Sequence, residues 1–410
     1  MPSWLLVMGR STGYGVVASA TRVAPPAGYA EVESTEARVQ ALARDSYTWD
    51  KLWVRVSANA TTAASTIRSR INGADGNQVV SIGAGLTGAF EDAVNSDALT
   101  TGNLFNTSLV AGAGGTLTVS VVAYRLSTAS NTTPILVAER RTGIGASATN
   151  YVNLMGFHKA LGVTTEANAQ YTFRAASTLS NMWVYASTNT KEDATTFRTR
   201  INGANGAQSV SITALTTGGF EDAVNPDSVV AGDEVCYQIV TGAGAGSIET
   251  SLTSIKSNSV GRQVAVARAS NDTSLAFGVT RYLTPEGDSQ EFATTELDTQ
   301  TDARMSFTAK NMLVHIASNS VDGATTFTLR KNTAASALTV PVAASTTGFF
   351  EDTTNTVDFV AGDLLNWQVV TGGTAGTMMI NAIGFELAQP TATAAFPGGS
   401  QMAMAIIGGI

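Results

Sequence analysis

The sequence predicts an all-β protein made of three tandem β-sandwich or jelly-roll domains. Three observations lead to this prediction. The same short motifs recur at a fixed spacing, the segments between turns alternate apolar and polar side chains, and long amphipathic helix patterns are absent. The chain has 410 residues, which leaves room for two to four domains at roughly 100–200 residues per domain.

The repeat is visible in several motifs that keep one register. Arg70-Ile-Asn-Gly-Ala returns at Arg200, a shift of 200 − 70 = 130, and a related segment begins at Arg330, after 330 − 200 = 130. A Phe-Glu-Asp motif recurs with the same step, at Phe90, Phe220 and Phe350. Solenoid units run to about 20–50 residues, so a period of 130 predicts a whole domain with its own core in each copy.

The expected domain boundaries follow from this register. We expect repeat 1 over residues 1–146, repeat 2 over 147–274 and repeat 3 over 275–388. The surplus, residues 389–410, contains two prolines and ends in an apolar stretch. We expect it to be an extra strand or clamp that docks on a neighbouring domain or subunit.

Within each copy the pattern is that of short strands joined by tight turns. In Thr195–Ile201, Phe197, Thr199 and Ile201 share one face, while two arginines occupy the other. Asn202-Gly203 then supplies two residues that tolerate positive φ, which predicts a hairpin. The glycine-rich stretches 112–115 and 242–246 are also interpreted as hairpin turns, because a phosphate loop needs a helix after it and strands follow here.

Composition excludes several classes of partner. Charged residues make up 14% of the chain, against about 25% on average, and the net charge is −8 with no cluster of Lys and Arg. Nucleic acid is therefore not an expected partner. No stretch approaches the roughly 20 apolar residues that span a bilayer, and no secretory signal is visible, so we expect synthesis in a cytoplasm and no membrane partner. One cysteine, Cys236, excludes an intrachain disulfide.

The repeated acid pair is the strongest candidate for a site. Neighbouring residues on a strand point to opposite faces, so such a pair cannot flank one glycosidic bond. Turn chemistry at solvated strand ends is favoured over pairing between domains, and both are favoured over calcium binding. The pairing hypothesis is specific: three equivalent arginines bridge to acids of their own or the next copy. The residues concerned are Arg70, Arg200, Arg330, Glu91, Asp92, Glu221, Asp222, Glu351 and Asp352.

Other reactive residue types give no catalytic constellation. His158 and His315 are far apart and not equivalent, and His315 aligns with Arg55 and Tyr185, which predicts a solvent-facing position. Cys236 is interpreted as a strand residue, and the tryptophans as core residues in preference to sugar-stacking platforms. We therefore expect no enzyme activity, no cofactor and no metal. At the chain ends, apolar residues are candidates for contact with neighbours: Trp4, Leu5, Leu6, Ile406 and Ile407.

The order of motifs in each copy resembles a known group of domains. The Arg-x-Asn-Gly-Ala hairpin, a Val-x-Ile strand, Thr-Gly-x-Phe-Glu-Asp, then Ala-Gly-Asp and an apolar strand resemble jelly-roll domains of tailed-phage virion proteins. The last part is also similar to C1q and tumour necrosis factor domains, which assemble as trimers. Copy 1 departs with Asn103 in place of Asp, and copy 3 with Thr333 in place of Gly.

The resemblance implies a role and an arrangement. It implies three jelly rolls fused into one pseudo-trimer, suited to a three-fold site on the capsid surface of a tailed phage. The expected function is a capsid decoration or cement protein, with other virion proteins, above all the major capsid protein, as partners. The alternative is a receptor- or glycan-binding fibre or adhesin module, which predicts exposed aromatic side chains at loop tips.

Overall fold

The structure is a computed structural model that describes residues 3–28, 32–128, 135–140, 143–158, 163–258, 262–267, 274–286 and 292–389. These residues form strands and three short 3-10 helices, η1 (Glu36–Arg38), η2 (Glu166–Asn168) and η3 (Glu296–Thr299), and no α-helix occurs among them. The prediction of an all-β protein is confirmed.

The strands of repeat 1 form two sheets. Their bounds are β1 (Ser3–Val16), β2 (Thr21–Ala24), β3 (Ala41–Leu42), β4 (Tyr47–Asn59), β5 (Ser65–Ile71), β6 (Ala74–Ile82), β7 (Gly88–Leu99), β8 (Leu104–Val110) and β9 (Leu117–Ser127). One sheet has the order β1-β9-β4-β7, and the other has the order β2-β8-β5-β6, with β3 paired to β8.

Repeat 2 follows the same plan. Its strands are β10 (Ile135–Arg140), β11 (Thr149–Val152), β12 (Gly156–His158), β13 (Tyr171–Thr172), β14 (Ser177–Asn189), β15 (Thr195–Ile201), β16 (Ala204–Ile212), β17 (Gly218–Asp222), β18 (Asp227–Val229), β19 (Glu234–Thr241) and β20 (Ile248–Asn258). The sheets have the orders β12-β10-β20-β14-β17 and β11-β19-β15-β16.

Repeat 3 completes the set. Its strands are β21 (Arg262–Ala267), β22 (Leu275–Ala276), β23 (Thr280–Leu283), β24 (Thr301–Asp302), β25 (Phe307–Asn319), β26 (Thr325–Lys331), β27 (Ala334–Val342), β28 (Gly348–Phe359), β29 (Leu364–Thr371) and β30 (Thr377–Ala388). The sheets have the orders β21-β30-β25-β28 and β23-β29-β26-β27.

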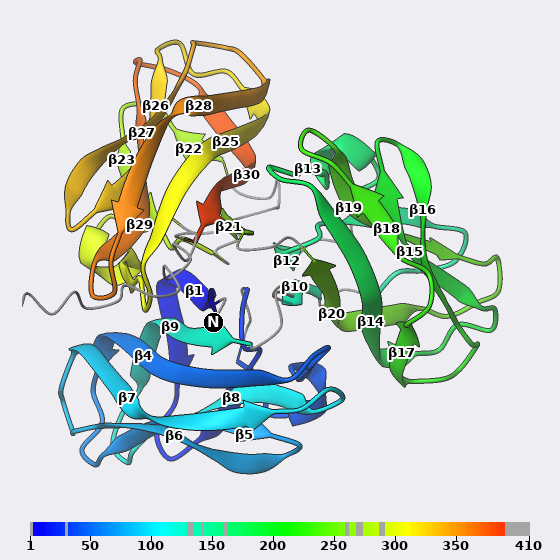
Figure 1. Cartoon of the computed structure of the whole chain (residues 1–410), viewed down its shortest axis with the longest axis horizontal. Coiled ribbons are helices and arrows are strands. Elements are labelled where there is room, and N and C mark those ends of the chain that lie inside the picture. Colours follow the sequence, from blue (N-terminus) through cyan, green and yellow to red (C-terminus); the bar gives the residue numbers. More distant parts are fainter. Residues whose placement is uncertain are drawn as a thin grey trace, which may run out of the picture.

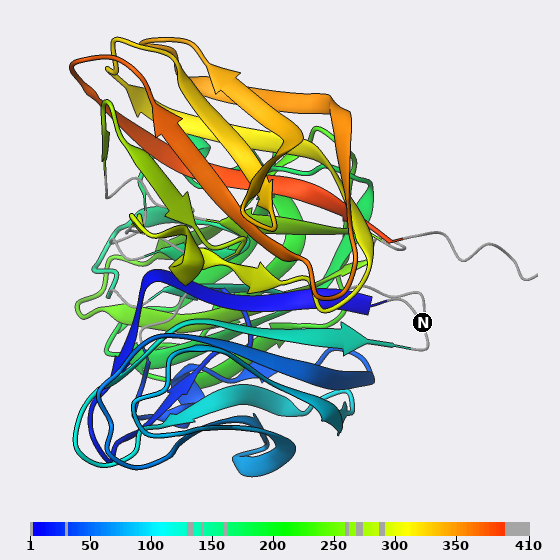
Figure 2. The ribbon, with the colours of Figure 1, turned by 90° about the vertical axis from the view of Figure 1, so that its left-hand side faces the viewer.

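The six sheets surround a common centre, and the strands β1, β9, β10, β20, β21 and β30 lie nearest to it (Figure 1). In each repeat we call the sheet that contains these strands the inner sheet and its companion the outer sheet. Strand β1 begins and β30 ends on the same side of the molecule, at the right in Figure 2.

Strand pairing divides the repeats earlier than the predicted boundaries at 146/147 and 274/275. Strand β10 lies inside the range expected for repeat 1, yet it pairs with β20 of repeat 2. Strand β21 likewise pairs with β30 of repeat 3. The first and last strands of each repeat are neighbours in its inner sheet, and the motif alignment missed the first strand because its sequence is poorly repeated. The expected tail is outside the described residues from Pro390 onward.

Apolar side chains fill the space between the two sheets of each repeat. In repeat 1 these include Trp49, Ile67 and Phe105, all 0% exposed. Strand β1 shows the period-2 rule clearly: Trp4 and Leu6 belong to this core, whereas Leu5 belongs to the core of repeat 3. One strand therefore contributes to two cores.

The predicted hairpins form in all three outer sheets. Asn72, Asn202 and Asn332 have φ near 50°, and Gly73 and Gly203 follow with φ of 79° and 77°. In repeat 3 the second position is Thr333, with φ 66°. A β-branched residue is strained in this left-handed region, where glycine is not.

We expect Thr333→Gly to raise the free energy of unfolding by about 0.5–1 kcal/mol, because it removes this strain at some cost in chain entropy. Gly203→Thr should lower it by a similar amount. Nothing lies within 4 Å of a side-chain carbon built at Gly203, so the effect there reports backbone strain alone. Urea unfolding of the two variants measures both values, and shifts of equal sign would contradict the explanation.

Candidate functional site: three interfaces between successive repeats

Each repeat carries a segment that packs over its own outer sheet and reaches the next repeat. We call these segments the arms: residues 32–46, 163–176 and 292–306, each containing one 3-10 helix. A glutamate of that helix holds each arm in place. Glu36 receives two hydrogen bonds from Arg70, at 2.8 and 2.9 Å. The same bidentate pair joins Arg200 to Glu166 and Arg330 to Glu296.

This arrangement corrects one sequence prediction. Arg70, Arg200 and Arg330 were expected to bridge to the repeated Glu-Asp pair. Each pairs with an acid of its own copy that lies in the arm, 34 residues earlier, and Arg70 also pairs with Asp75 in β6. Alignment of the repeats did not reveal this, because Glu36, Glu166 and Glu296 lie outside the motifs that made the repeat visible.

A second set of arginines, at the end of the arms, crosses to the next repeat. Arg44 of repeat 1 bonds Glu221 of repeat 2 at 2.5 Å. Arg174 of repeat 2 bonds Glu351 of repeat 3 at 2.5 Å. Arg304 of repeat 3 bonds Glu91 of repeat 1 at 2.9 Å, which closes the circle.

The two sides of these ion pairs differ in burial. The three arginine side chains are 5%, 8% and 6% exposed, whereas the glutamates are about half exposed. A buried cation needs a partner, and the neighbouring repeat supplies a carboxylate to each arm arginine. Arg304 also pairs with Asp302 of its own arm, at 3.1 Å. The inner sheet supplies a further acceptor. Lys51 and Asn311 have positive φ and turn their carbonyls toward Arg304 Nε at 2.8 Å and Arg174 Nε at 3.1 Å.

The aspartate of each Glu-Asp pair has a separate role inside its own repeat. Asp92 accepts hydrogen bonds from the amides of Val79, Val94 and Asn95. Burial raises its pKa, but these hydrogen bonds outweigh burial and hold the pKa below the usual value. The pKa values of Asp222 and Asp352 are lowered in the same way. The aspartates thus serve the turn chemistry favoured from the sequence, while the glutamates meet the next repeat.

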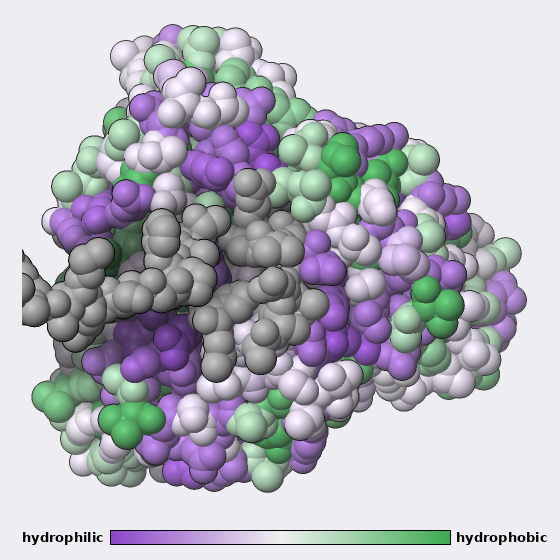
Figure 3. All heavy atoms as spheres, in the orientation of Figure 1, coloured by the Kyte–Doolittle hydropathy of each residue, from purple (hydrophilic) through white to green (hydrophobic). Residues whose placement is uncertain are grey.

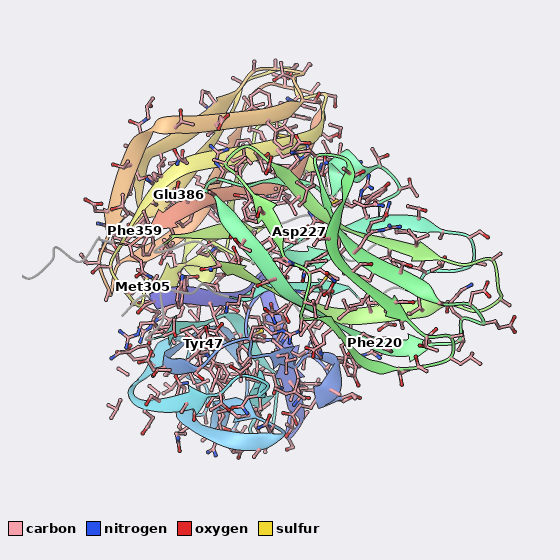
Figure 4. The ribbon with its side chains drawn as sticks, turned by 45° about the vertical axis from the view of Figure 1, so that its right-hand side comes forward. Tyr47, Phe220, Asp227, Met305, Phe359 and Glu386 are labelled. Carbon is pink, nitrogen blue, oxygen red and sulfur yellow. The ribbon has the colours of Figure 1, made fainter. Side chains whose placement is uncertain are left out.

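Apolar side chains make the rest of each interface. The core of repeat 1 includes Trp183 and Leu252 of repeat 2, and the core of repeat 2 includes Leu313 and Ala382 of repeat 3. The core of repeat 3 takes in a larger set from repeat 1: Leu5, Val7, Trp53, Val121 and Ala123. In Figure 4, Met305 of the repeat 3 arm lies beside strands of repeat 1, in agreement with this shared core.

The remaining predicted interface residues are placed as follows. Trp4, Leu5 and Leu6 are buried in β1, and Leu5 is the one that meets repeat 3. Ile406 and Ile407 lie outside the described residues. All five tryptophans are nearly or fully buried, the most exposed being Trp183 at 6%, as the core interpretation predicted. Cys236 is buried in β19, where burial raises the pKa of its thiol.

His315 is a second correction. It was expected to face solvent because Arg55 and Tyr185 occupy the equivalent positions, yet it is 6% exposed. Its ring stacks on Phe349, with centroids 4.0 Å apart. All three positions face an adjacent repeat, so their unlike side chains reflect three different interfaces and not solvent. His158 ends β12, and its side chain lies outside the described residues.

One buried acid was not singled out from the sequence. Glu286 of repeat 3 is 5% exposed and lies against β1 of repeat 1. Burial raises its pKa to about 8, although a hydrogen bond from the Val7 amide lowers it. Repeats 1 and 2 have Pro26 and Gly156 at this register, so nothing in the repeat pattern marked it.

The arm arginines were also missed, although a signal for them exists. Arg44, Arg174 and Arg304 are themselves 130 residues apart. An alignment that counted charged positions outside the best-conserved motifs would have found them.

A double-mutant cycle on Arg304 and Glu91 tests the interface pair. We expect Arg304→Met and Glu91→Gln to show a coupling energy of about 1–3 kcal/mol in urea unfolding, because the buried guanidinium loses the carboxylate of repeat 1 and keeps only Asp302 of its own arm. The matched control is the more exposed pair of Arg68 and Asp75, at 3.0 Å within repeat 1, for which we expect about 0–1 kcal/mol. Equal coupling in the two cycles would show that the interface pair is an ordinary surface pair.

The stability of the protein should depend on pH through His315. Burial lowers its pKa to about 4, and a hydrogen bond to the Gln170 backbone offsets part of that shift. Between pH 6.5 and 4 the unfolded chain binds more protons, so stability falls as the pH falls.

We expect the difference in unfolding free energy between wild type and His315→Gln to shrink by about 3 kcal/mol from pH 7 to pH 4. Carboxyl groups titrate in both proteins and cancel in this difference. A pH-independent difference would mean that His315 takes up its proton normally in the folded state.

No group of three or more His, Cys, Asp or Glu side chains among the described residues could hold a metal ion. No helix in the described part of the chain is long and apolar enough to cross a bilayer.

Comparisons with known proteins do not identify a family for this chain. No family model matches the chain, and no curated protein matches it. Among solved structures it is similar to one described under "The Triple Jelly Roll Fold and Turret Assembly in an Archaeal Virus", at 12% identity over 93% of this chain and 95% of that one, with a TM-score of 0.19. It is also similar to a structure from Sulfolobus turreted icosahedral virus, at 12% identity over 86% and 82%, with a TM-score of 0.19. Scores this low support no transfer of fold or function to this chain.

Proposed function

We propose that the chain is a non-enzymatic structural protein of a virion, in which three jelly-roll domains of one chain close into a pseudo-trimer. The observation that carries the proposal is the circle of equivalent ion pairs. Each arm arginine bonds a glutamate of the next repeat, and the third pair returns to the first repeat. One chain thus makes, within itself, the contacts that a trimer makes between three chains.

The role that suits such an object is occupation of a three-fold or locally three-fold position on a capsid, as a decoration or cement protein. The composition supports a structural role, since only 14% of the residues are charged and small residues are abundant. On the face shown in Figure 3, polar and apolar atoms of the described residues are intermixed. Its partners would be other virion proteins, above all the major capsid protein.

Electron microscopy tests both parts of this proposal. Images of the purified chain should show one compact particle with three lobes, and a string of three separate beads would contradict the pseudo-trimer. Antibodies raised against the chain should label the shell of intact particles of the virus that encodes it. Labelling of the tail alone would overturn the decoration role and leave the pseudo-trimer standing.

A further inference from the structure

The three interfaces share the arm arginine and its glutamate but differ at the charged positions around that pair. Residues that occupy the same place in different repeats can be identified from the 130-residue register of the arms and from strand pairing in the inner sheets. At three such places, the charges on the two sides of an interface are complementary in the observed cyclic order of the repeats and would not be complementary in the reversed order.

The first place is the third residue of each 3-10 helix, which is Arg38 in repeat 1, Asn168 in repeat 2 and Asp298 in repeat 3. Arg38 forms an ion pair with Glu249 of repeat 2 and another, at 3.2 Å, with Glu33 of its own repeat. Glu249 lies opposite Thr188 in the inner sheet. The residues in the same pairing position of repeats 1 and 3 are uncharged: Thr118, opposite Ala58, and Met379, opposite Ser318.

The second place follows the arm arginine. Asp45 of repeat 1 pairs with Lys256 of repeat 2 at 3.5 Å, whereas the other arms have Ala175 and Met305 here. Lys256 lies opposite Ser180 in its sheet, so its own repeat offers no acid at the facing position.

The equivalent sheet residues in the other repeats have an oppositely charged neighbour within the repeat. Arg125 pairs with Asp50 at 2.5 Å. Glu386 pairs with Lys310 at 3.6 Å. In this set, Lys256 has no acid on the strand that faces it, and its ion pair is made with Asp45 in the arm of the preceding repeat.

The third place is the position of Arg55, Tyr185 and His315 in the inner sheets. Arg55 is 6% exposed and is attracted by Asp298 of the repeat 3 arm, which β4 contacts through η3. Tyr185 packs against the apolar core of repeat 1, and His315 faces Gln170 of repeat 2. Of the three arms, the arm of repeat 3 is the one with an acid, Asp298, at this helix position, and the cation that it faces is the buried Arg55.

We propose that these unlike charges specify the cyclic order of the repeats, so that the inner sheet of each repeat recognises the arm of the preceding one. The proposal rests on the closed ring proposed above. In the reversed ring, Asp298 would face Glu249, and Asp45 would face Glu386. Arg55 would lie against Asn168 without an acid. Specificity arises here because the wrong pairings bring like charges together or leave a buried charge unpaired.

The test inverts the signs at one interface while keeping its two ion pairs. It also breaks the pair of Arg38 with Glu33 inside repeat 1, which the half-variant D45K/K256E described below leaves intact. The variant R38E/D45K/E249R/K256E retains opposite charges across the interface between repeats 1 and 2, and its net charge is unchanged. In the reversed ring, the new cation at position 249 would meet Asp298, and the new cation at position 45 would meet Glu386. We therefore expect the variant to lose its preference for the native order when it is refolded from urea.

Cross-linking reports the order. Ser46 and Ser306 are exposed residues two positions after Arg44 and Arg304, and Ala223 is exposed two positions after Glu221. Ser46→Cys with Ala223→Cys reports the native order, and Ser306→Cys with Ala223→Cys reports the reversed order, after treatment with a flexible bismaleimide. Cys236 is fully buried, so it does not compete.

With wild-type charges, the native reporter should cross-link, and the reversed reporter should remain near background. In the sign-inverted variant we expect the reversed reporter to rise at least tenfold. The control R22E/E192R inverts two charges in β2 and in the loop after β14, outside these interfaces, and should leave both reporters unchanged. A reversed signal that stays at background in a folded variant, or one already present with wild-type charges, would overturn the proposal.

Two further measurements guard against a variant that fails to fold. The half-variants R38E/E249R and D45K/K256E each keep one wild-type pair and should each raise the reversed signal. Refolding the wild type in 1 M NaCl, where the Debye length is about 3 Å, should raise it without any substitution at the charges. If salt has no effect, connections between repeats and not charges set the order. That result would leave the ring itself intact.

Discussion

A buried guanidinium that must find its carboxylate in another repeat is the constraint on which this architecture depends. Each arm arginine is at most 8% exposed, and its acid lies on the inner sheet of the following repeat. Removing a cation from water costs several kcal/mol unless a partner and further hydrogen bonds receive it. Repeats that separated would take these carboxylates from all three arginines, and only Arg304 would keep an acid of its own arm, Asp302. The contact therefore favours the closed arrangement over independent domains.

The arginines can reach their partners because two other features hold both sides of the contact. Arg70, Arg200 and Arg330 bind the arm glutamates and so fix the segments from which the interface arginines project. On the inner sheets, residues with positive φ turn a carbonyl toward the guanidinium at two of the interfaces. Arg70, Arg200 and Arg330 are thus positioning residues: they hold the arms and do not themselves cross the interfaces.

Strand β1 has buried apolar side chains on both faces, which ties two cores together. In β1 the alternation sends Trp4 and Leu6 to one core and Leu5 to another. A strand buried on both faces shows no polar face to mark its orientation, so period-2 analysis is uninformative there. Strands β10 and β21 were assigned to the preceding repeats because the repeated motifs do not extend to them.

The strand content, the threefold repeat and the hairpins can be predicted from the residues alone, because they depend on local alternation, on register and on residues such as Asn202-Gly203 that tolerate positive φ. The sequence also indicated that Glu91 and its equivalents matter. Only the tertiary structure decided their partners, because Arg304 and Glu91 are 213 residues apart and meet through the closure of the ring. The burial of His315 was decided in the same way. Arg55, Tyr185 and His315 are unlike side chains at one position of the repeat, which by itself predicts exposure to solvent. In the structure each of them faces a different neighbouring repeat, and His315 is buried.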